Sequence, residues 1–415
     1  MMMKRHISRL LLICLSVCLL AGVFTSCEKR DETLTLYVYN WGEYISDGSD
    51  ESVDTNAEFE KYCKEELGIT VKVNYSTFAS NESMYAKVSS GSTKYDVIIP
   101  SDYMIERMIN EDMLAPLDLS KIPNYQFIDD AFKGENIYYE CGREELYSVP
   151  YFYGMIGIIY NTSIVDENDE QIGSWDLMWD EQYKGDILQF NNSRDAFGTA
   201  QYKLGLDVNG EDEEKWRLAL DELLEQKKIV QGYVMDEIFN KMQSGSAAIA
   251  AYYAGDYLSM YEDNEDLAFF YPQEGTNSYI DAMCIPKNAE HYDLALEYIN
   301  FMCSHDIAMA NALYTYYASP VTTVVDDPEY QEAMEEVHED AMSILYEQAH
   351  DVPSQAYLNL SSDGLSMLNV LWEELKAKSS IGDGIYIGCG VILGVLATIA
   401  VYQLIKKRRW AKLYD

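Results

Sequence analysis

The feature that most constrains the fold of this chain is a regular alternation of strand and helix patterns that begins at residue 33. Apolar runs rich in β-branched and aromatic residues, which are typical of strands, occur at residues 33–40, 69–77 and 95–101. A segment with helical spacing of its apolar residues follows each run, at residues 56–67, 81–91 and 103–113. Strands that alternate with helices predict an α/β fold, built on a parallel sheet with right-handed crossovers.

Aromatic and polar side chains follow two of these strands at the point where each strand ends. Trp41, Glu43 and Tyr44 come after the first strand, and Ser101 and Tyr103 come after the third. In open parallel sheets, ligands bind beyond the carboxyl ends of the strands. We therefore expect these five side chains to line a ligand site, although a single aromatic residue at a strand end is more often a packing residue.

A second α/β unit follows, and two long strands are predicted to connect it with the first. The aromatic and apolar run at residues 147–161 has the pattern of a strand that passes from one unit to the other, and the run at residues 277–287 carries the chain back. A second strand and helix pattern lies between them at residues 186–256, and residues 292–317 form one helical stretch. The simplest architecture is two α/β lobes with a ligand cleft between them.

Both ends of the chain carry features of membrane attachment. Residues 1–27 contain a basic start, an apolar run of 15 residues and small residues before Cys27, which is typical of an export signal and similar to the signal of bacterial lipoproteins. We expect a lipid on Cys27. Residues 385–405 are 21 residues without a charge and predict a transmembrane helix, and the basic segment 406–415 predicts a cytoplasmic tail. The intervening domain would then lie outside the cytoplasm.

The charge of the chain excludes nucleic acid as a partner and favours cations. The sequence has 70 acidic and 30 basic residues, which gives a formal net charge of −40. A charge of this sign also serves solubility, so it is weak evidence without a site. The scattered histidines and cysteines predict no metal site, and the chain has no phosphate-binding loop, so we expect no cofactor. The spacing leaves open whether disulfides form among Cys63, Cys141, Cys284 and Cys303.

Tyrosine is abundant, with 35 residues, and several tyrosines lie near acidic residues in predicted loops. Examples are Tyr44 beside Glu43, Tyr103 beside Asp102, Tyr253 near Asp256, and Tyr279 near Asp281. Aromatic faces attract cations, and carboxylates form charge-assisted hydrogen bonds to ammonium groups. A cleft with both groups suits an elongated aliphatic polycation, whose methylene chains would lie along the rings.

Five segments resemble, in order, the corresponding blocks of bacterial spermidine/putrescine-binding proteins. They are YNWGEYI, YDVIIPSDYMIERM, LYSVPYFYGMIGIIYN, WDLMWDEQYKGDILQFNNSRDAFG and YIDAMCIPKNAEHYDLALEYINFM, and the resemblance spans about residues 33–376. It implies the type II periplasmic-binding-protein fold and a receptor, without enzymatic activity, that binds putrescine or spermidine. It further implies an ABC importer whose permease and ATPase are separate subunits. We accordingly expect one lobe to comprise residues 33–154 and 280–325, and the other residues 155–279 and 326–378.

The resemblance also implies which residues contact the ligand. It adds six residues to those at the strand ends: Asn192, Asp195, Tyr253, Tyr279, Asp281 and Tyr317. Asn192 stands where another carboxylate is common in the family, which would favour the shorter amine or shift the binding register. Gly42 replaces a threonine of some members, and Tyr253 and Tyr279 replace tryptophans. A last contact, a glutamine in some members, has no good match near Leu358 or Asn359.

Three other functions are weighed against this one. The same fold could bind a different organic cation, and paired carboxylates could serve a glycosidase. No nucleophile–base triad is apparent in the sequence, which disfavours an enzyme. A purely structural surface protein would need neither the carboxylates nor the rings.

Overall fold

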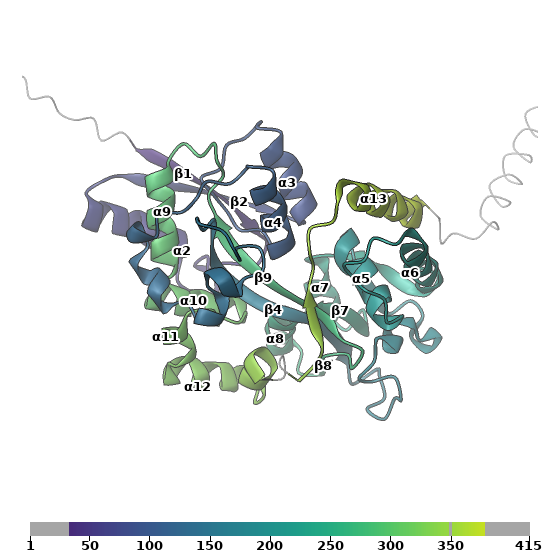
Figure 1. The fold of residues 1–415 in the computed structure, drawn as a ribbon. Helices are drawn as coiled ribbons and strands as arrows, with labels where there is room; N and C mark the ends of the chain where they lie inside the picture. The colour runs from purple at the N-terminus through teal and green to yellow at the C-terminus, as the bar shows by residue number, and fades with distance from the viewer. Residues whose placement is uncertain (1–32, 348–350, 378–415) are drawn as a thin grey trace, which may run out of the picture.

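The computed structural model describes residues 33–347 and 351–377 (Figure 1). The expected signal segment with Cys27, the expected span at residues 385–405 and the basic tail all lie outside these residues and stay predictions. Within the described ranges, no helix has the length and the apolar character needed to cross a membrane. The four cysteines of the described ranges, Cys63, Cys141, Cys284 and Cys303, are free thiols in the structure.

Ten strands form one continuous mixed sheet, in the order β2-β1-β3-β9-β4-β7-β5-β6, with β10 paired to β9 and β8 paired to β4. The strands are β1 Leu34–Trp41, β2 Val71–Phe78, β3 Val97–Ile98, β4 Ser148–Asn161, β5 Ile187–Phe190, β6 Val230–Val234, β7 Ile249–Tyr253, β8 Leu267–Phe270, β9 Thr276–Cys284 and β10 Ser354–Ala356. The helices that cover the sheet are α2 Thr55–Tyr62, α3 Asn81–Ser89, α4 Asp102–Asn110, α5 Ser193–Lys203, α6 Glu213–Gln226, α7 Glu237–Gln243, α8 Ala254–Asp263, α9 Tyr292–Met302, α10 His305–Thr315, α11 Thr322–Val325, α12 Pro328–Val337 and α13 Ser362–Ala377.

The first three strands pair as the alternation of patterns predicts. β1 runs parallel to β2, from Leu34 opposite Val71 to Trp41 opposite Phe78, and β3 pairs with β1 on its other edge. The carboxyl ends of β1 and β3 therefore lie at the same edge of the sheet. We call these strands, with α2, α3, α4 and the segment 111–147 that follows α4, the β1 side of the molecule.

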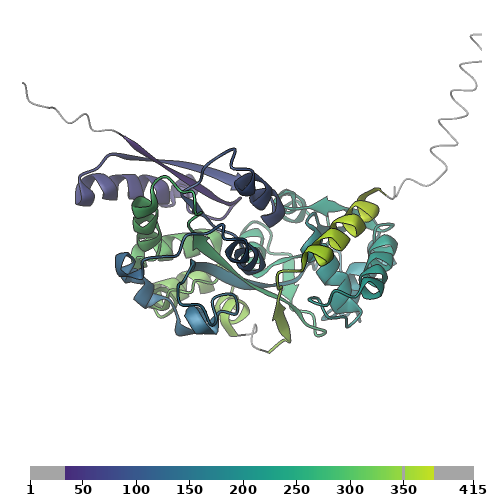
Figure 2. The same ribbon diagram turned by 45° about the horizontal axis from the view of Figure 1, so that its top comes forward.

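A second group of strands, which we call the β5 side, consists of β5, β6, β7 and β8 with the helices α5 to α8 and α13. β5 runs parallel to both β6 and β7, so their carboxyl ends also share one edge. Figure 1 shows this group, mostly in teal with α13 in yellow, beside the purple and blue β1 side, and Figure 2 shows the same separation from a second direction.

Two long strands connect the sides, as the apolar runs predict. The first half of β4 pairs antiparallel with β9, and its second half pairs antiparallel with β7 and β8. The parallel pairing that the alternation predicts is thus found within each side, and the connecting strands add antiparallel pairs. A chain that leaves one side and returns must run in both directions across the boundary, so the sheet is mixed.

The helical stretch predicted at residues 292–317 is two helices rather than one. Ser304 adopts an extended conformation between α9 and α10, and a new helix begins after it. Both helices pack against the β1 side, where Phe59 of α2 contacts the rings of Tyr298 and Phe301. The break allows the chain to turn around α2 without losing its buried apolar face.

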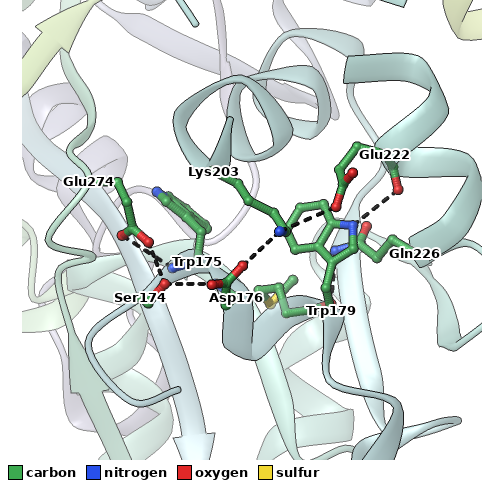
Figure 3. Close-up of polar contacts among 9 residues, drawn as sticks. Ser174, Trp175, Asp176, Trp179, Lys203, Glu222, Gln226 and Glu274 are labelled. Carbon is green, nitrogen blue, oxygen red and sulfur yellow. Dashed lines mark hydrogen bonds and ion pairs between the residues drawn. The ribbon is translucent and has the colours of Figure 1, made fainter. Parts of the chain in front are cut away.

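A polar and aromatic cluster ties the β5 side together away from the sheet edge (Figure 3). Lys203 at the end of α5 lies 2.6 Å from a carboxylate oxygen of Asp176 and 3.3 Å from one of Glu222 on α6. Trp175, in the short 3-10 helix Trp175–Trp179, is 1% exposed and donates from Nε1 to the carbonyl of Gly275 at 2.9 Å. Figure 3 shows these side chains converging from the 3-10 helix, α5, α6 and the segment before β9.

We expect Trp175→Ala to destabilise the protein strongly. A fully buried aromatic side chain leaves a cavity when it is removed, and its loss costs about 3–5 kcal/mol of unfolding free energy. Trp179→Ala is the matched control, since Trp179 is only partly buried and water can fill the vacated space. Denaturant titration of both variants is the measurement, and an equal loss in the two would contradict this assignment of the core.

Candidate ligand-binding site

A cavity lies between the two sides, where the carboxyl ends of β1, β3, β5 and β7 approach one another, and its empty space, including the part open to solvent, is ≈ 740 Å³. All the ligand contacts expected from the sequence line it: Trp41, Glu43, Tyr44, Ser101, Tyr103, Asn192, Asp195, Tyr253, Tyr279, Asp281 and Tyr317. These residues come from segments up to 276 positions apart in the chain. The structure therefore brings the whole predicted set together in one cavity.

The cavity is lined by acids and is without bases. Its carboxylates are Glu43, Glu82, Asp102, Asp195, Asp236, Asp256 and Asp281, and none of the described residues that line it is Lys, Arg or His. No group of His, Cys, Asp and Glu in the described ranges is arranged to hold a metal ion. An organic cation is therefore the guest that the lining suits best, because buried carboxylates need counter-charge.

Four tyrosines hold these carboxylates in place by hydrogen bonds. The donors and acceptors are Tyr44 Oη to Asp281 Oδ2 at 2.8 Å, Tyr253 Oη to Asp195 Oδ2 at 2.8 Å, Tyr317 Oη to Asp256 Oδ2 at 2.7 Å, and Tyr103 Oη to Glu82 Oε1 at 2.9 Å. A neutral hydroxyl fixes one carboxylate oxygen but does not cancel the charge, so the other oxygen can accept a bond from a ligand. Asp281 Oδ1, for example, is buried without a hydrogen-bond partner among the described residues.

The loop after β1 has a strained conformation that presents Glu43 to the cavity mouth. Glu43 has φ +49°, in the left-handed region that few residues other than glycine adopt. The next residue is fixed from behind, since the carbonyl of Tyr44 accepts hydrogen bonds from Tyr151 Oη at 2.9 Å and Asn40 Nδ2 at 3.3 Å. These buried partners keep the Glu43 side chain at the rim and the Tyr44 ring inside.

The loop also approaches the β5 side closely, which explains the glycine at residue 42. A Cβ atom on Gly42 would lie 2.5 Å from Oδ2 of Asp236, so a larger residue would clash with this carboxylate. Glu43 and Asp236 are therefore neighbours across the mouth, one from each side. This pair places two exposed negative charges where a guest enters.

Asn192 does not add a carboxylate to the cavity but holds the carboxylate of Asp195 in place. It caps α5, with Oδ1 accepting from the backbone N–H of Asp195 at 2.8 Å, and its Nδ2 donates to Asp195 Oδ2 at 2.7 Å. The acidic group at residue 195 thus receives bonds from both Asn192 and Tyr253. Asp236 and Asp256, which were not among the predicted contacts, add two further carboxylates to the lining.

Most of these acids lie at helix N-termini, where the partial positive charge of the helix stabilises a carboxylate. Glu82, Asp102, Asp195 and Asp256 are in the first turns of α3, α4, α5 and α8. Each of these helices begins at the cavity edge of the sheet. The helix N-termini therefore offset part of the negative charge of these carboxylates, which no basic side chain of the described lining offsets.

The compensation is incomplete, and burial raises the pKa of the enclosed acids. The pKa of Asp195 and that of Asp281 are each raised to about 6, and the pKa of Asp256 to about 8, with burial as the largest cause in all three. Burial also raises the pKa of Glu43, and the neighbouring charge of Asp236 raises it further. Ionising the buried Asp195, Asp256 and Asp281 in the empty cavity is therefore unfavourable.

Five lining residues that matter for the site were not among the predicted contacts: Glu82, Asp102, Asp236, Asp256 and Tyr357. A signal existed for Glu82 and Asp256, since each follows the carboxyl end of a strand, as Trp41 and Ser101 do. Tyr357 had none, because it lies between a three-residue strand and a helix that no periodic pattern marked.

Comparison with known proteins places the chain in a family. Residues 57–336 match the family model described as bacterial extracellular solute-binding protein. The spermidine/putrescine-binding periplasmic protein of Escherichia coli K12 is 30% identical over 296 residues, which cover 71% of this chain and 80% of that protein. The spermidine/putrescine-binding periplasmic protein 1 of Haemophilus influenzae is 30% identical over 371 residues, which cover 86% of this chain and 96% of that protein.

The solved structures agree with this result. The spermidine/putrescine ABC transporter substrate-binding protein PotD from Streptococcus pneumoniae, in complex with calcium and HEPES, is 31% identical with a TM-score of 0.63. The similarity covers 83% of this chain and 99% of that one. The fold is thus the α/β fold of periplasmic binding proteins, and the protein is an extracytoplasmic solute-binding protein and not an enzyme. The chain belongs to the bacterial extracellular solute-binding protein family, among the spermidine/putrescine-binding proteins.

Proposed function

We propose that this protein binds a linear polyamine, putrescine or spermidine, and delivers it to the permease of an ABC importer whose ATPase is a separate subunit. The observation that carries the proposal is the cavity itself, with seven carboxylates, tyrosine rings and no basic side chain in its lining. The names of the relatives support the same ligand class and the same transporter.

The chemistry of the lining matches a polyamine better than a compact cation. The carboxylates come from several segments of the lining. Besides burial, the charges of Asp236 and Glu43 raise the pKa of Asp256, and the charge of Glu82 raises the pKa of Asp195, so these acids form two groups of neighbours. Asp281, on β9, accepts a hydrogen bond from Tyr44. Ammonium groups separated by methylene chains can reach such spaced acids, and the intervening carbons can pack on the rings of Tyr253 and Tyr279.

The proposed mechanism is hinged closure of two lobes, as in the type II periplasmic-binding-protein fold. The β1 side would belong to the lobe of residues 33–154 and 280–325, and the β5 side to the lobe of residues 155–279 and 326–378. Each lobe supplies carboxylates to the cavity, so an empty closed form suffers repulsion across it. A polyamine removes this repulsion, and the connecting strands β4 and β9 are the natural hinge.

The location we propose is the outer face of the cell membrane. Attachment by a lipid on Cys27 and by a helix at residues 385–405 remains a prediction from the sequence. Such a tether would keep the receptor near its permease without changing the chemistry of the cavity.

We expect Asp281→Asn and Asp256→Asn to weaken putrescine and spermidine binding severely. Removing one partner of a buried, hydrogen-bonded charge pair costs about 2–5 kcal/mol, which is a loss of about 30-fold or more in affinity. Calorimetric titration against putrescine, spermidine and a panel of other organic cations measures this loss and identifies the preferred ligand. Asp130→Asn is the control, because the Asp130 side chain is 94% exposed and far from any cavity-lining residue in sequence.

Unchanged polyamine affinity in both cavity variants would refute the assignment of the site. A stronger response to a monoamine or an amino acid than to either polyamine would refute the ligand class but keep the cavity.

We also expect polyamine affinity to fall as the pH is lowered from 8 to 5. A carboxyl group with a raised pKa holds its proton more tightly in the empty cavity than in open water. Low pH therefore stabilises the empty form, in which these groups are protonated and do not attract a cation. The bound form carries ionised carboxylates, so binding releases protons in this range. Each linked proton changes the affinity by up to about tenfold per pH unit.

Titration calorimetry at several pH values, in buffers of different ionisation enthalpy, measures both the affinity and the proton count. Asp256→Asn should remove the pH dependence of polyamine affinity above pH 7, since Asp256 has the highest of these raised pKa values, about 8. Affinity that stays constant between pH 5 and 8 would contradict the prediction.

A further inference from the structure

Residues 356–359, which join β10 to α13, are held by their main chain from both sides of the cavity. Figure 1 shows this yellow-green segment rising from β10, beside β9, toward α13 above α5 and α6, and Figure 2 shows the same path from a second direction. We call these four residues the clasp. β10 pairs with β9 at its start, and α13 packs on α5 and α6 at its end.

The β5 side binds the clasp through two side chains. Asn209 donates from Nδ2 to the carbonyl of Ala356 at 2.9 Å and accepts at Oδ1 from the N–H of Leu358 at 2.8 Å. Arg194 donates from Nη2 to the carbonyl of Leu358 at 3.2 Å. With α13 packed on the same side, the clasp is a fixed part of the β5 side.

The β1 side reaches the clasp with two other side chains, neither of which lines the cavity. Tyr138 donates from Oη to the carbonyl of Tyr357 at 2.7 Å. Glu106 of α4 accepts at Oε2 from the N–H of Asn359 at 2.8 Å. No other hydrogen bond of the described residues uses the Glu106 carboxylate or the Tyr138 hydroxyl, so the clasp is the partner for both groups.

The clasp carries one side chain into the cavity. Tyr357 is 3% exposed, and its ring lies 6.3 Å from that of Tyr103 on the β1 side and 4.5 Å from the Arg194 guanidinium on the β5 side. It lines the cavity together with Asp195. The Tyr357 ring therefore forms part of the cavity wall and separates the cavity from the buried Arg194 guanidinium.

We propose that Glu106 and Tyr138 are positioning residues for ligand retention: they hold the clasp, and with it the Tyr357 ring, against the β1 side while a polyamine is bound. This inference rests on the proposed function, because it concerns the rate at which the same ligand leaves. Both bonds use peptide groups of the clasp, so they form only when the two sides are together. Opening must break them before the guest is released.

Loss of either bond should act mainly on dissociation. Ligand entry occurs before the clasp meets the β1 side, whereas release requires its separation, so affinity changes of this kind appear in the off-rate. The bond to an ionised acceptor is the stronger of the two. We expect Glu106→Ala to speed dissociation by roughly 10- to 100-fold and Tyr138→Phe by about 2- to 10-fold.

The test is stopped-flow fluorescence of the full chain in detergent with putrescine and spermidine, using Trp41 in the cavity as an intrinsic reporter. We expect association rates within about threefold of the parent protein, and an unchanged melting temperature of the ligand-free protein. Glu106→Gln should restore slow dissociation, because its amide oxygen still accepts a hydrogen bond.

Two matched controls lie within the β1 side. Glu60 accepts from the N–H of Val73 at 2.9 Å and also pairs with the exposed Lys72, and Tyr62 donates to Glu297 at 2.6 Å. Glu60→Ala and Tyr62→Phe therefore remove a carboxylate and a tyrosine hydroxyl bond away from the cavity. These controls should leave both rates unchanged.

The possible outcomes separate the two proposals. Normal polyamine binding with unchanged dissociation in Glu106→Ala and Tyr138→Phe overturns the clasp and leaves the proposed function standing. A melting temperature of the ligand-free variant that falls in step with faster dissociation also overturns it, since the residues would then be structural. A parent protein that binds neither amine refutes the function and the clasp together.

Discussion

The constraint on which the structure depends is the burial of many carboxylates in one cavity without a basic residue in its lining. Each ionised group prefers water, and the enclosed cavity offers little of it, which is why burial raises the pKa of Asp195, Asp256 and Asp281. A protein that only needed stability would pair these acids with Lys or Arg. Here the described lining holds no such partner, and the polyamine that we propose as the ligand would supply the counter-charge.

Tyrosine is the residue that makes such a cavity workable. Its hydroxyl can orient a carboxylate, as Tyr317 does for Asp256, without neutralising the charge that the guest must meet. Its ring can meanwhile pack on methylene groups or face a cation. Helix N-termini add a second, fixed source of partial positive charge behind four of the acids, which a lysine side chain would supply only by occupying the cavity.

Much of this arrangement could be predicted from the sequence, because it follows from the position of strand ends. The rule placed Trp41 and Ser101 at one edge, and family resemblance added residues such as Asp195 and Asp281, all of which line the cavity. The pairing of tyrosines with acids could not be predicted in this way. Neighbours in sequence suggested Tyr44 with Glu43, whereas Tyr44 bonds to Asp281, 237 residues away. Successive residues diverge at a strand end, so adjacency in the chain says little about contact.

The clasp shows why other parts of the site are invisible in the sequence. Recognition of a ligand by charge depends on particular side chains, and these can be identified in the sequence. The clasp is held through peptide groups of residues 356–359, which every amino acid except proline offers equally, so its sequence carries no trace of the contacts. Nothing in the sequence distinguishes its partners Glu106 and Asn209 from ordinary surface residues, and only the fold brings both of them to the clasp. Selection of a ligand and retention of a ligand are therefore assigned to different groups, and the second can be altered by mutation while the first is left intact.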